Sequence, residues 1–306
     1  MEADIYVGRI APSPTGLLHV GHAQTFAIAQ RRATEHRGVL LLRVEDLDSQ
    51  RCKPEILAQM LEDLAWLGLR WNNDASRPEY KQSSRAHLYR QAWKLLYDVG
   101  AVYPSPHSRK DVERCLSAPH PGEGEPVFPP ELRPAYMHES VGSHEYPPEL
   151  QNLTQPTKVN WRFRVPDGRQ VTFTDGYYGE QCFTAGRDFG DFIIWSGALD
   201  AASYELAVVV DDLQMGVTEV VRGQDLLLST ARQMLLAEIL SSHFGRGSGP
   251  PLRYFHCPLV LDESTGERLA KRTPSTTLRG LRASGMTVPE LSEKYYDRSL
   301  VPRGDA

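Results

Sequence analysis

The amino-acid sequence predicts an α/β fold in which helices cover a parallel sheet. Apolar runs at 5–11 and 39–44 alternate with stretches at 20–36 and 54–67 where apolar residues recur at three- and four-residue spacing. Strands that alternate with helices in this order lie parallel in one sheet. A stretch from 117 to 150 with eight prolines and three glycines breaks the alternation, so we expect an inserted surface loop without a core element there.

The first strand is expected over residues 5–11 and the first helix over residues 20–36. Two prolines and a glycine separate them, and Gly38 is the expected helix stop. Ligands of open α/β sheets bind at the edge where such strands end. The free backbone N–H groups and the partial positive charge of a helix N-terminus suit phosphate. We therefore expect an anion site at this strand–helix junction.

His19, Gly21 and His22 stand at the start of that helix. Either imidazole can donate to a phosphate oxygen, and a glycine lets a flat group approach the backbone. A four-residue pattern of this kind also occurs by chance, so alone it identifies no site.

A second strand is expected over residues 39–44, and three carboxylates follow it at Glu45, Asp46 and Asp48. A solvated turn is the more common origin of such a cluster, and a ligand site at the carboxyl end of the strand is the alternative. The residues alone leave both explanations open.

Two further helices are expected over residues 54–67 and 84–99, each with apolar residues on one face. A proline opens the first of them, and a glycine ends each. We expect the indoles of Trp66, Trp71 and Trp93 in the core.

Residues 159–165 and 170–174 are expected to pair as a hairpin around Asp167 and Gly168, with one packed face and one solvent-facing face. Another short strand, expected over 191–195, resumes the main domain.

Residues 204–212 are expected to form a central strand that ends in two aspartates, and residues 217–221 to form the next strand. An amphipathic helix is expected over 226–244, with Arg232 and Gln233 on its polar side.

Composition bounds the class of protein. The chain has 306 residues, of which 41% are hydrophobic and 24% charged, with a net charge of −5 and a pI of about 6.1. These values are ordinary for a globular protein of one large or two medium domains, and the acidic balance argues against a protein that coats nucleic acid. No apolar run approaches the ~20 residues of a membrane span and no charged-then-apolar leader opens the chain, so we expect a cytoplasmic protein.

The cysteines are widely spaced and no pair has metal-ribbon spacing. We expect free thiols, with neither a zinc ribbon nor a disulfide framework. The four stand at Cys52, Cys115, Cys182 and Cys257.

The run RIAPSPTGLLHVGH, from Arg9 to His22, resembles the N-terminal signature of glutamate-type class I aminoacyl-tRNA synthetases. The resemblance implies a class I synthetase fold, a Rossmann-like nucleotide-binding α/β fold with an inserted subdomain and a short helical C-terminal segment. It also implies ATP, with its Mg²⁺, and L-glutamate as substrates. The residues that it assigns to ATP are His19, Gly21 and His22, and those that it assigns to glutamate are Arg9, Ala11 and Ser13.

Three later blocks extend the resemblance. Residues 43–48 (RVEDLD) resemble the family block whose Glu binds the α-ammonium of glutamate, which implies that role for Glu45. The runs YELAVVVDD and VVRGQDL resemble blocks that complete the glutamate pocket, which implies Tyr204 and Arg222. An arginine can make a bidentate bond to a carboxylate, and a surface ion pair is the other explanation of Arg222.

A last strand is expected over residues 254–261, and the basic run RLAKR follows it at 268–272. This run resembles in part the Lys-Met-Ser-Lys-Ser loop of class I synthetases: Lys271 is retained, whereas Arg268 and Arg272 replace the first Lys and the last Ser. A mobile cationic loop stabilises charge on the phosphates, and a solvated loop is the other explanation. The residues implied in catalysis are Lys271, His19 and His22, and Arg268 and Lys271 are implied in ATP binding.

Many relatives in this family place a zinc in the inserted subdomain. The corresponding positions here are Ser105, His107, Phe128 and Leu132. Serine and leucine are not workable zinc ligands, and His107 with Cys115 cannot complete a four-ligand site. We therefore expect no metal site and no zinc.

The resemblance divides the chain into a first half of the catalytic domain, an inserted subdomain, a second half, and a loop with a truncated helical region. Only 34 residues follow Arg272, so we expect no anticodon-binding domain. Residues 300–304 match a protease-cleavable linker. The boundaries are 1–103, 104–190, 191–261 and 262–306.

The truncated branch of the family attaches glutamate to queuosine in the anticodon loop of tRNA(Asp), and the short chain implies this acceptor. A monomer with no membrane partner is expected. A ligase of the same fold that joins a small acid without RNA, and a non-catalytic RNA-binding paralogue, are the alternatives. The basic rim expected to contact RNA consists of Arg31, Arg32, Arg268, Lys271, Arg272 and Arg279.

Overall fold

The computed structural model describes residues 5–107, 127–137, 146–245, 252–261, 277–296 and 300. Arg268, Lys271, Arg272 and Cys115 lie outside these ranges. No helix in the described part of the chain is long and apolar enough to cross a membrane.

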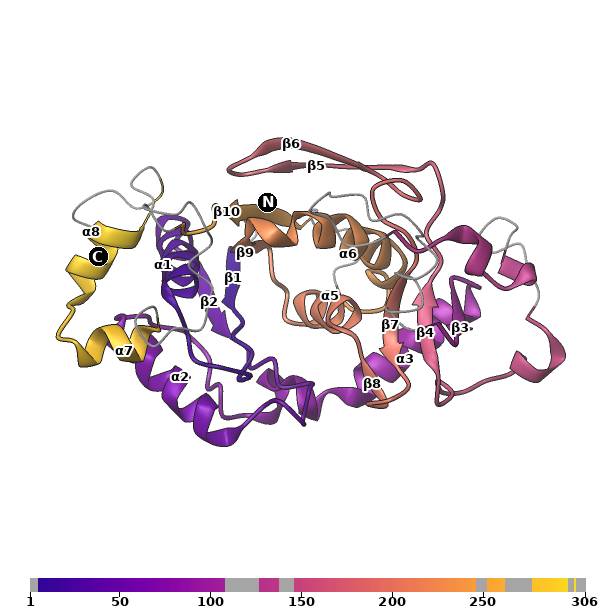
Figure 1. The fold of residues 1–306 in the computed structure, drawn as a ribbon, viewed down its shortest axis with the longest axis horizontal. Coiled ribbons are helices and arrows are strands. Elements are labelled where there is room, and N and C mark those ends of the chain that lie inside the picture. The colour runs from indigo at the N-terminus through magenta and orange to yellow at the C-terminus, as the bar shows by residue number, and fades with distance from the viewer. Residues whose placement is uncertain are drawn as a thin grey trace.

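Parallel strands from the first and the second half of the chain lie side by side in one layer (Figure 1). Strand β1 pairs in parallel with β2, and β9 pairs in parallel with β10. The backbone N–H of Thr218, just before β9, donates to the carbonyl of Val7 over 2.8 Å and links the two pairs. The predicted parallel arrangement is confirmed. The strands are β1 (Val7–Ile10), β2 (Val39–Leu42), β9 (Glu219–Gly223) and β10 (Arg253–Cys257).

Some helices lie beside these parallel strands, and others lie farther along the molecule (Figure 1). The helices expected over 20–36, 54–67, 84–99 and 226–244 are confirmed, with ends that differ by a few residues. They are α1 (Val20–Glu35), α2 (Pro54–Trp66), α3 (Ala86–Asp98) and α6 (Leu227–Leu240). Two short helices, α7 (Leu278–Ala283) and α8 (Val288–Tyr295), form the expected helical C-terminal segment beside α1.

Gly38 follows α1 for a reason other than the expected left-handed stop. The left-handed residue is Arg37, with φ 51°, and not the glycine. A Cβ on Gly38 would lie 2.4 Å from the carbonyl oxygen of Tyr6, so only glycine lets β2 start this close to the chain entering β1.

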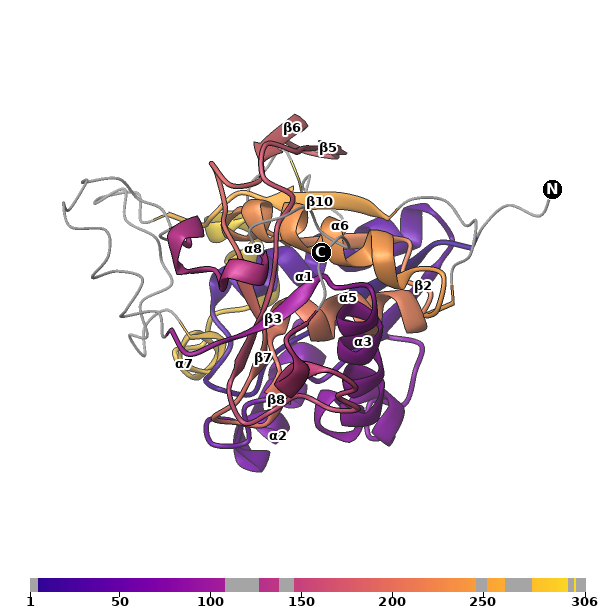
Figure 2. The ribbon, with the colours of Figure 1, turned by 90° about the vertical axis from the view of Figure 1, so that its right-hand side faces the viewer.

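An antiparallel sheet lies at the end of the molecule opposite α7 and α8 (Figures 1 and 2). Its strand order is β3-β4-β7-β8. The strand expected near 191–195 is confirmed, but it pairs with β4 in this sheet and so the sheet crosses the expected domain boundaries after 103 and 190. The strands are β3 (Val102–Ser105), β4 (Asn160–Phe163), β7 (Phe192–Ser196) and β8 (Ala201–Ala202).

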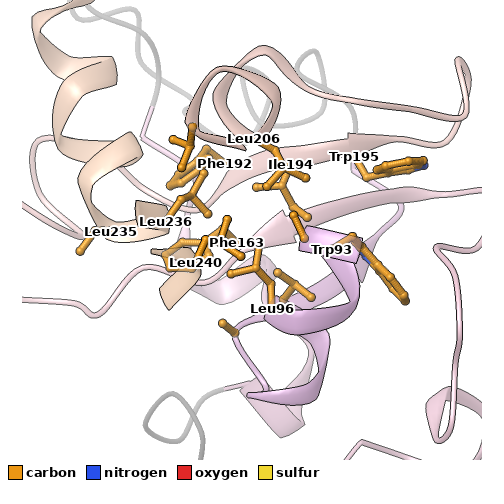
Figure 3. Packing of buried hydrophobic residues seen from close by; sticks show 14 of the residues in the cluster. Trp93, Leu96, Phe163, Phe192, Ile194, Trp195, Leu206, Leu235, Leu236 and Leu240 are labelled. Carbon is orange, nitrogen blue, oxygen red and sulfur yellow. The ribbon is translucent and has the colours of Figure 1, made fainter. Parts of the chain in front are cut away.

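The largest hydrophobic core joins this sheet to α3 and α6 (Figure 3). Trp93 is fully buried and its ring meets that of Trp161 edge-on, with 4.9 Å between centroids. Trp66 and Trp71 are half-buried and pack against a second core around the parallel strands. The expected core role of Trp93 is confirmed, and the other two indoles lie at the margin of a core.

The hairpin expected between residues 159–165 and 170–174 is wrong. Strand β4 pairs with β3 and β7, whereas β5 (Gln170–Asp175) pairs with β6 (Gly179–Thr184) and touches β10. The turn belongs to a second Asp-Gly pair, where the carboxylate of Asp175 accepts the backbone N–H of Tyr177 and of Tyr178 at 3.0 and 2.9 Å. The β5–β6 arm lies above β10 and α6 (Figures 1 and 2).

The strand expected over 204–212 is also wrong, because the segment forms helix α5 (Tyr204–Gln214). The Ser203 side chain caps it by accepting from the N–H of Leu206. Every residue from 205 to 212 is buried. A helix buried on all sides shows no polar phase, so its apolar run cannot be told from a buried strand by periodicity.

The proline-rich stretch contributes to a core, against expectation. Phe128 and Met137 are buried against Tyr103 in a small cluster of their own. The chain near these residues forms one-turn 3₁₀ helices, which change its direction without a long series of backbone hydrogen bonds. They are Pro130–Leu132, Ala135–Met137 and Pro148–Leu150, and others stand at Pro78–Tyr80, Gln82–Ser84 and Gln224–Leu226.

Candidate active site

A cavity of about 970 Å³ lies where the parallel strands end. Its wall combines the chain after β1, the start of α1, the end of β9, the chain after β10 and one side of α7. All of the predicted site residues that the structure describes line it, although their roles stay predictions. They are Arg9, Ala11, Ser13, His19, Gly21, His22, Glu45, Tyr204 and Arg222.

The two histidines form the cap of α1. His19 is the N-cap residue, and its Nδ1 accepts the backbone N–H of Gly21 at 3.2 Å. The backbone N–H of His19 donates in turn to Nδ1 of His22, also at 3.2 Å. Because both Nδ1 atoms accept, each ring carries its proton on Nε2, which suits a phosphate oxygen. The first turn of α1 holds no acidic residue that would neutralise its positive end.

Arg9 enters the cavity from the floor formed by β1. Its Nη1 donates to the carbonyl of Val221 at 3.0 Å, and its Nε lies 3.4 Å from Oδ1 of Asp212. No described residue accepts from its Nη2. A buried arginine with an uncommitted donor edge is suited to a carboxylate ligand.

Glu45 is the carboxylate of the same region. Its Oε1 accepts from Arg43 at 3.0 Å, and its Oε2 accepts a long bond of 3.5 Å from the Ser13 hydroxyl. Burial raises the pKa of Glu45 above its usual value, and the charges of Arg43 and Arg9 oppose that rise. An ammonium group beside Oε2 would favour the ionised form further.

Asp211 and Asp212 were expected to end a strand, but they lie buried in helix α5. Asp212 accepts from Arg43 at 2.5 Å, and Asp211 accepts from Arg85 at 2.6 Å and from Tyr89 at 3.0 Å. Burial alone would raise the pKa of Asp212, but Arg43 and Arg9 hold it below its usual value. The two aspartates therefore position arginines instead of meeting solvent.

Arg222 is buried at the end of β9, and no residue in the described part of the chain forms an ion pair with it. Its Nη2 donates to Thr230 at 2.7 Å, its Nη1 donates to Gln233 at 2.8 Å and to Tyr204 at 3.5 Å, and its Nε donates to His256 at 3.2 Å. Four of its five N–H groups therefore face protein acceptors, counting one bond to each partner. One N–H therefore remains for a ligand in this geometry, fewer than a bidentate bond to a carboxylate uses, and the role of Arg222 in a glutamate pocket stays a prediction.

Two residues of α6 that we expected on a solvent-facing side are buried. Gln233 accepts from Arg222 and donates to Glu205 of α5 at 2.8 Å, and Arg232 lies 3.7 Å from the same carboxylate. Sequence reasoning missed these partners because polar residues at helical spacing are most often solvated.

The expected basic rim is only partly at the cavity. Arg31 forms an ion pair with Glu35 at 2.7 Å, and Arg32 donates two hydrogen bonds to Glu219, at 2.6 and 2.8 Å. Neither lines the cavity, because they lie about 18 Å along α1 from the capped end at a rise of ~1.5 Å per residue. Arg279 does line it, from α7.

Arg162 of β4 binds most of the positions that correspond to zinc ligands in relatives. Its Nε donates to the Ser105 hydroxyl at 3.2 Å, its Nη2 donates to the His107 carbonyl at 3.3 Å, and its guanidinium lies 4.1 Å over the Phe128 ring. Among the residues that the structure describes, no three His, Cys, Asp or Glu side chains are grouped to hold a metal ion. The donors at these positions do not fit zinc, and the expectation of no zinc stays a prediction.

The amino-acid sequence matches a known family and several known proteins. The family described as "tRNA synthetases class I (E and Q), catalytic domain" matches residues 6–292. The chain is 39% identical to the "Glutamyl-Q tRNA(Asp) synthetase" of Nitratidesulfovibrio vulgaris, covering 93% of this chain and 83% of that protein. It is 40% identical to the protein of the same name from Rhodopirellula baltica, covering 98% and 87%.

Longer ligases resemble it over part of their length. The "Glutamate--tRNA ligase" of Thermosynechococcus vestitus is 35% identical over 93% of this chain and 55% of its own length. A crystal structure of a glutamate tRNA ligase from Elizabethkingia meningosepticum, in complex with its amino acid, shares the fold with a TM-score of 0.69 and 23% identity. That match covers 92% of this chain, which spans about half, 53%, of the solved ligase.

Proposed function

The chain belongs to the class I glutamyl- and glutaminyl-tRNA synthetase family, and from this premise we propose that it activates L-glutamate with ATP and transfers it to queuosine of tRNA(Asp). The enzyme is a ligase with the class I catalytic fold. The names of the curated relatives, matched over 83% and 87% of their length, support the queuosine acceptor.

The observation that carries the proposal is that two complementary groups of side chains line one cavity. Arg9, Arg222 and Glu45 offer cations and an anion, and glutamate has two carboxylates and one ammonium. The capped N-terminus of α1 offers His19 and His22 to phosphate. Arg9 and Tyr204 receive a carboxylate, Glu45 receives the ammonium, and the single spare N–H of Arg222 assists.

The reaction has two steps. The α-carboxylate of glutamate attacks the α-phosphate of ATP, forming glutamyl-adenylate and releasing pyrophosphate. A hydroxyl of queuosine then attacks the acyl carbon and releases AMP. The protein contributes by positioning and by electrostatic stabilisation, in which we assign Lys271, with Arg268 or Arg272, to the phosphates. Mg²⁺ arrives with the nucleotide.

We also propose a monomer that acts in the cytoplasm. All of the assigned residues that the structure describes line the cavity of a single chain, which supports a monomer. ATP and tRNA, the proposed substrates, are cytoplasmic.

Pyrophosphate exchange with ATP and glutamate, without tRNA, tests the first step. Aspartate and glutamine serve as controls for the pocket. We expect exchange with glutamate alone, followed by transfer of labelled glutamate to queuosine-containing tRNA(Asp) and not to tRNA(Asp) that lacks queuosine. Exchange without transfer to any tRNA would favour a small-acid ligase, and binding of RNA without exchange or transfer would favour the non-catalytic paralogue.

A further inference from the structure

His256 of β10 connects the β5–β6 arm to the cavity without lining it. The imidazole is fully buried, and its Nδ1 lies 2.6 Å from Oδ2 of Asp175. Its Nε2 lies 3.2 Å from Nε of Arg222 and 3.1 Å from the hydroxyl of Thr230. Since neither His256 nor Asp175 reaches the cavity wall, both can act on a ligand only through Arg222.

The hydrogen bonds around Asp175 decide where the imidazole proton lies. The carboxylate accepts backbone N–H groups from Tyr177, Tyr178 and His256 itself. Burial alone would raise the pKa of Asp175, but the hydrogen bonds from His256 and these backbone groups hold it below its usual value. An ionised carboxylate is an acceptor only, so Nδ1 of His256 carries the proton.

The other ring nitrogen therefore presents a lone pair. The Thr230 hydroxyl accepts from Arg222, and its own hydrogen faces two acceptors, Nε2 of His256 at 3.1 Å and the carbonyl of Leu226 at 3.2 Å. Arg222 has only donors. Nε2 of His256 therefore accepts the hydrogen bond from the Nε–H of Arg222.

A doubly protonated ring would place a second cation against Arg222. The charged groups that face His256 are Asp175 from β5, Arg222 from β9 and Arg9 from β1, with the rings of Phe173 and Tyr254 beside it. Burial lowers the pKa of His256 and Asp175 opposes this. The neutral ring is the form that fits the geometry.

We propose that His256, oriented by Asp175, is a positioning residue that fixes the Nε edge of Arg222 and so presents its spare N–H, together with the Tyr204 hydroxyl, to the substrate carboxylate. This inference rests on the proposed function, because the carboxylate is that of glutamate. Asp175, in the turn of the β5–β6 arm, thereby supports the amino-acid pocket from behind its wall.

A matched pair of substitutions separates the two ring nitrogens. His256→Gln places an amide oxygen near the position of Nε2 and can accept from Arg222, whereas His256→Asn reaches only the position of Nδ1. Val220→Ala is the control for lost packing, because Val220 is buried on the same face of β9 two residues before Arg222. Pyrophosphate exchange is measured with glutamate and with ATP varied, and unfolding midpoints are recorded for every variant.

We expect His256→Asn to raise the KM for glutamate about tenfold or more, as loss of a hydrogen bond to a charged group implies, with the KM for ATP within about twofold. His256→Gln should retain most of the affinity for glutamate, and Val220→Ala should change neither KM. Asp175→Asn should behave like His256→Asn, and it carries the test if that variant does not fold.

Equal KM values for glutamate in the Asn and Gln variants would overturn the inference while leaving the proposed function intact. A parallel rise of both KM values, matched by Val220→Ala, would also overturn it, since that pattern marks a general structural role. If no amino acid supports pyrophosphate exchange by the wild-type enzyme, with or without tRNA, the proposed function is overturned. The inference would then fall with it.

Discussion

Nε of Arg9 lies 3.4 Å from Oδ1 of Asp212, although the first residue belongs to β1 and the second to α5. The same carboxylate oxygen accepts from Arg43 at 2.5 Å. One buried aspartate thus holds two arginines beneath the cavity, and the fold and the pocket depend on a shared ion cluster.

Asp212→Asn removes the charge from that cluster and leaves two buried cations less compensated. Breaking one partner of a buried ion pair costs about 3–5 kcal/mol, so the free energy of unfolding should fall by roughly that amount. Urea unfolding measures it. Asp200→Asn is the control, since Asp200 pairs with Arg90 at the surface and should change little. Similar losses in both variants would contradict the assignment.

Glu45→Gln tests the ammonium site. The neutral amide cannot attract a cation, so the KM for glutamate should rise by about tenfold or more while the KM for ATP changes little. Exchange kinetics separate the two constants. Asp48→Asn, which removes a carboxylate that does not line the cavity, should leave both unchanged. A glutamate KM that Glu45→Gln does not alter would place the ammonium elsewhere.

Arg222→Lys should weaken glutamate binding almost as much as Arg222→Ala. A lysine ammonium has three donors on a flexible stem and cannot serve the four acceptors around the guanidinium. The KM for glutamate is the measurement, and Arg169→Lys, at an exposed pair with Glu238, is the control. If Arg222→Ala leaves that KM within about twofold, the assigned pocket is wrong.

Arg162→Met tests how the inserted segment is held. Methionine keeps much of the stem but loses the bonds to Ser105 and His107 and the contact with the Phe128 ring, so the unfolding free energy should fall by about 2–4 kcal/mol. Wild-type protein treated with a chelator should unfold at an unchanged midpoint. A lower midpoint after chelation would reveal a bound metal and contradict the expectation of no zinc.

Acid should remove the stabilisation that Arg32 and Glu219 provide. Burial alone would raise the pKa of Glu219, but the hydrogen bonds and charge of Arg32 hold it below its usual 4.5. A carboxyl with a lowered pKa in the folded state stabilises the protein above pH 4.5, and that stabilisation is lost as the pH falls through the folded pKa.

The comparison for this pH effect is Glu219→Gln. Its deficit in unfolding free energy, relative to wild type, should be largest near neutral pH and should shrink toward pH 3. Glu238→Gln, at an exposed pair with Arg169, should show little deficit at any pH. A deficit for Glu219→Gln that does not change with pH would show that packing, and not charge, is lost.

The sequence by itself determined the local parts of this protein. Strand β1, the loop after it and the capped start of α1 follow from one short run, because caps, prolines and helical periodicity act between near neighbours. The same run and its family resemblance predicted residues that the fold brings into one cavity. The roles of those residues still await the kinetic tests.

Tertiary structure decided what depends on distant partners. Residues 204–212 carry no polar phase because they are buried on every side, so only their packing between α3 and α6 distinguishes helix from strand. Of the two Asp-Gly pairs, the one at residues 175–176 joins a hairpin, because β4 finds its partners in β3 and β7 and so does not pair with β5. The number of donors that Arg222 keeps for a ligand is fixed by four side chains that reach it only in the folded chain: Tyr204, Thr230, Gln233 and His256.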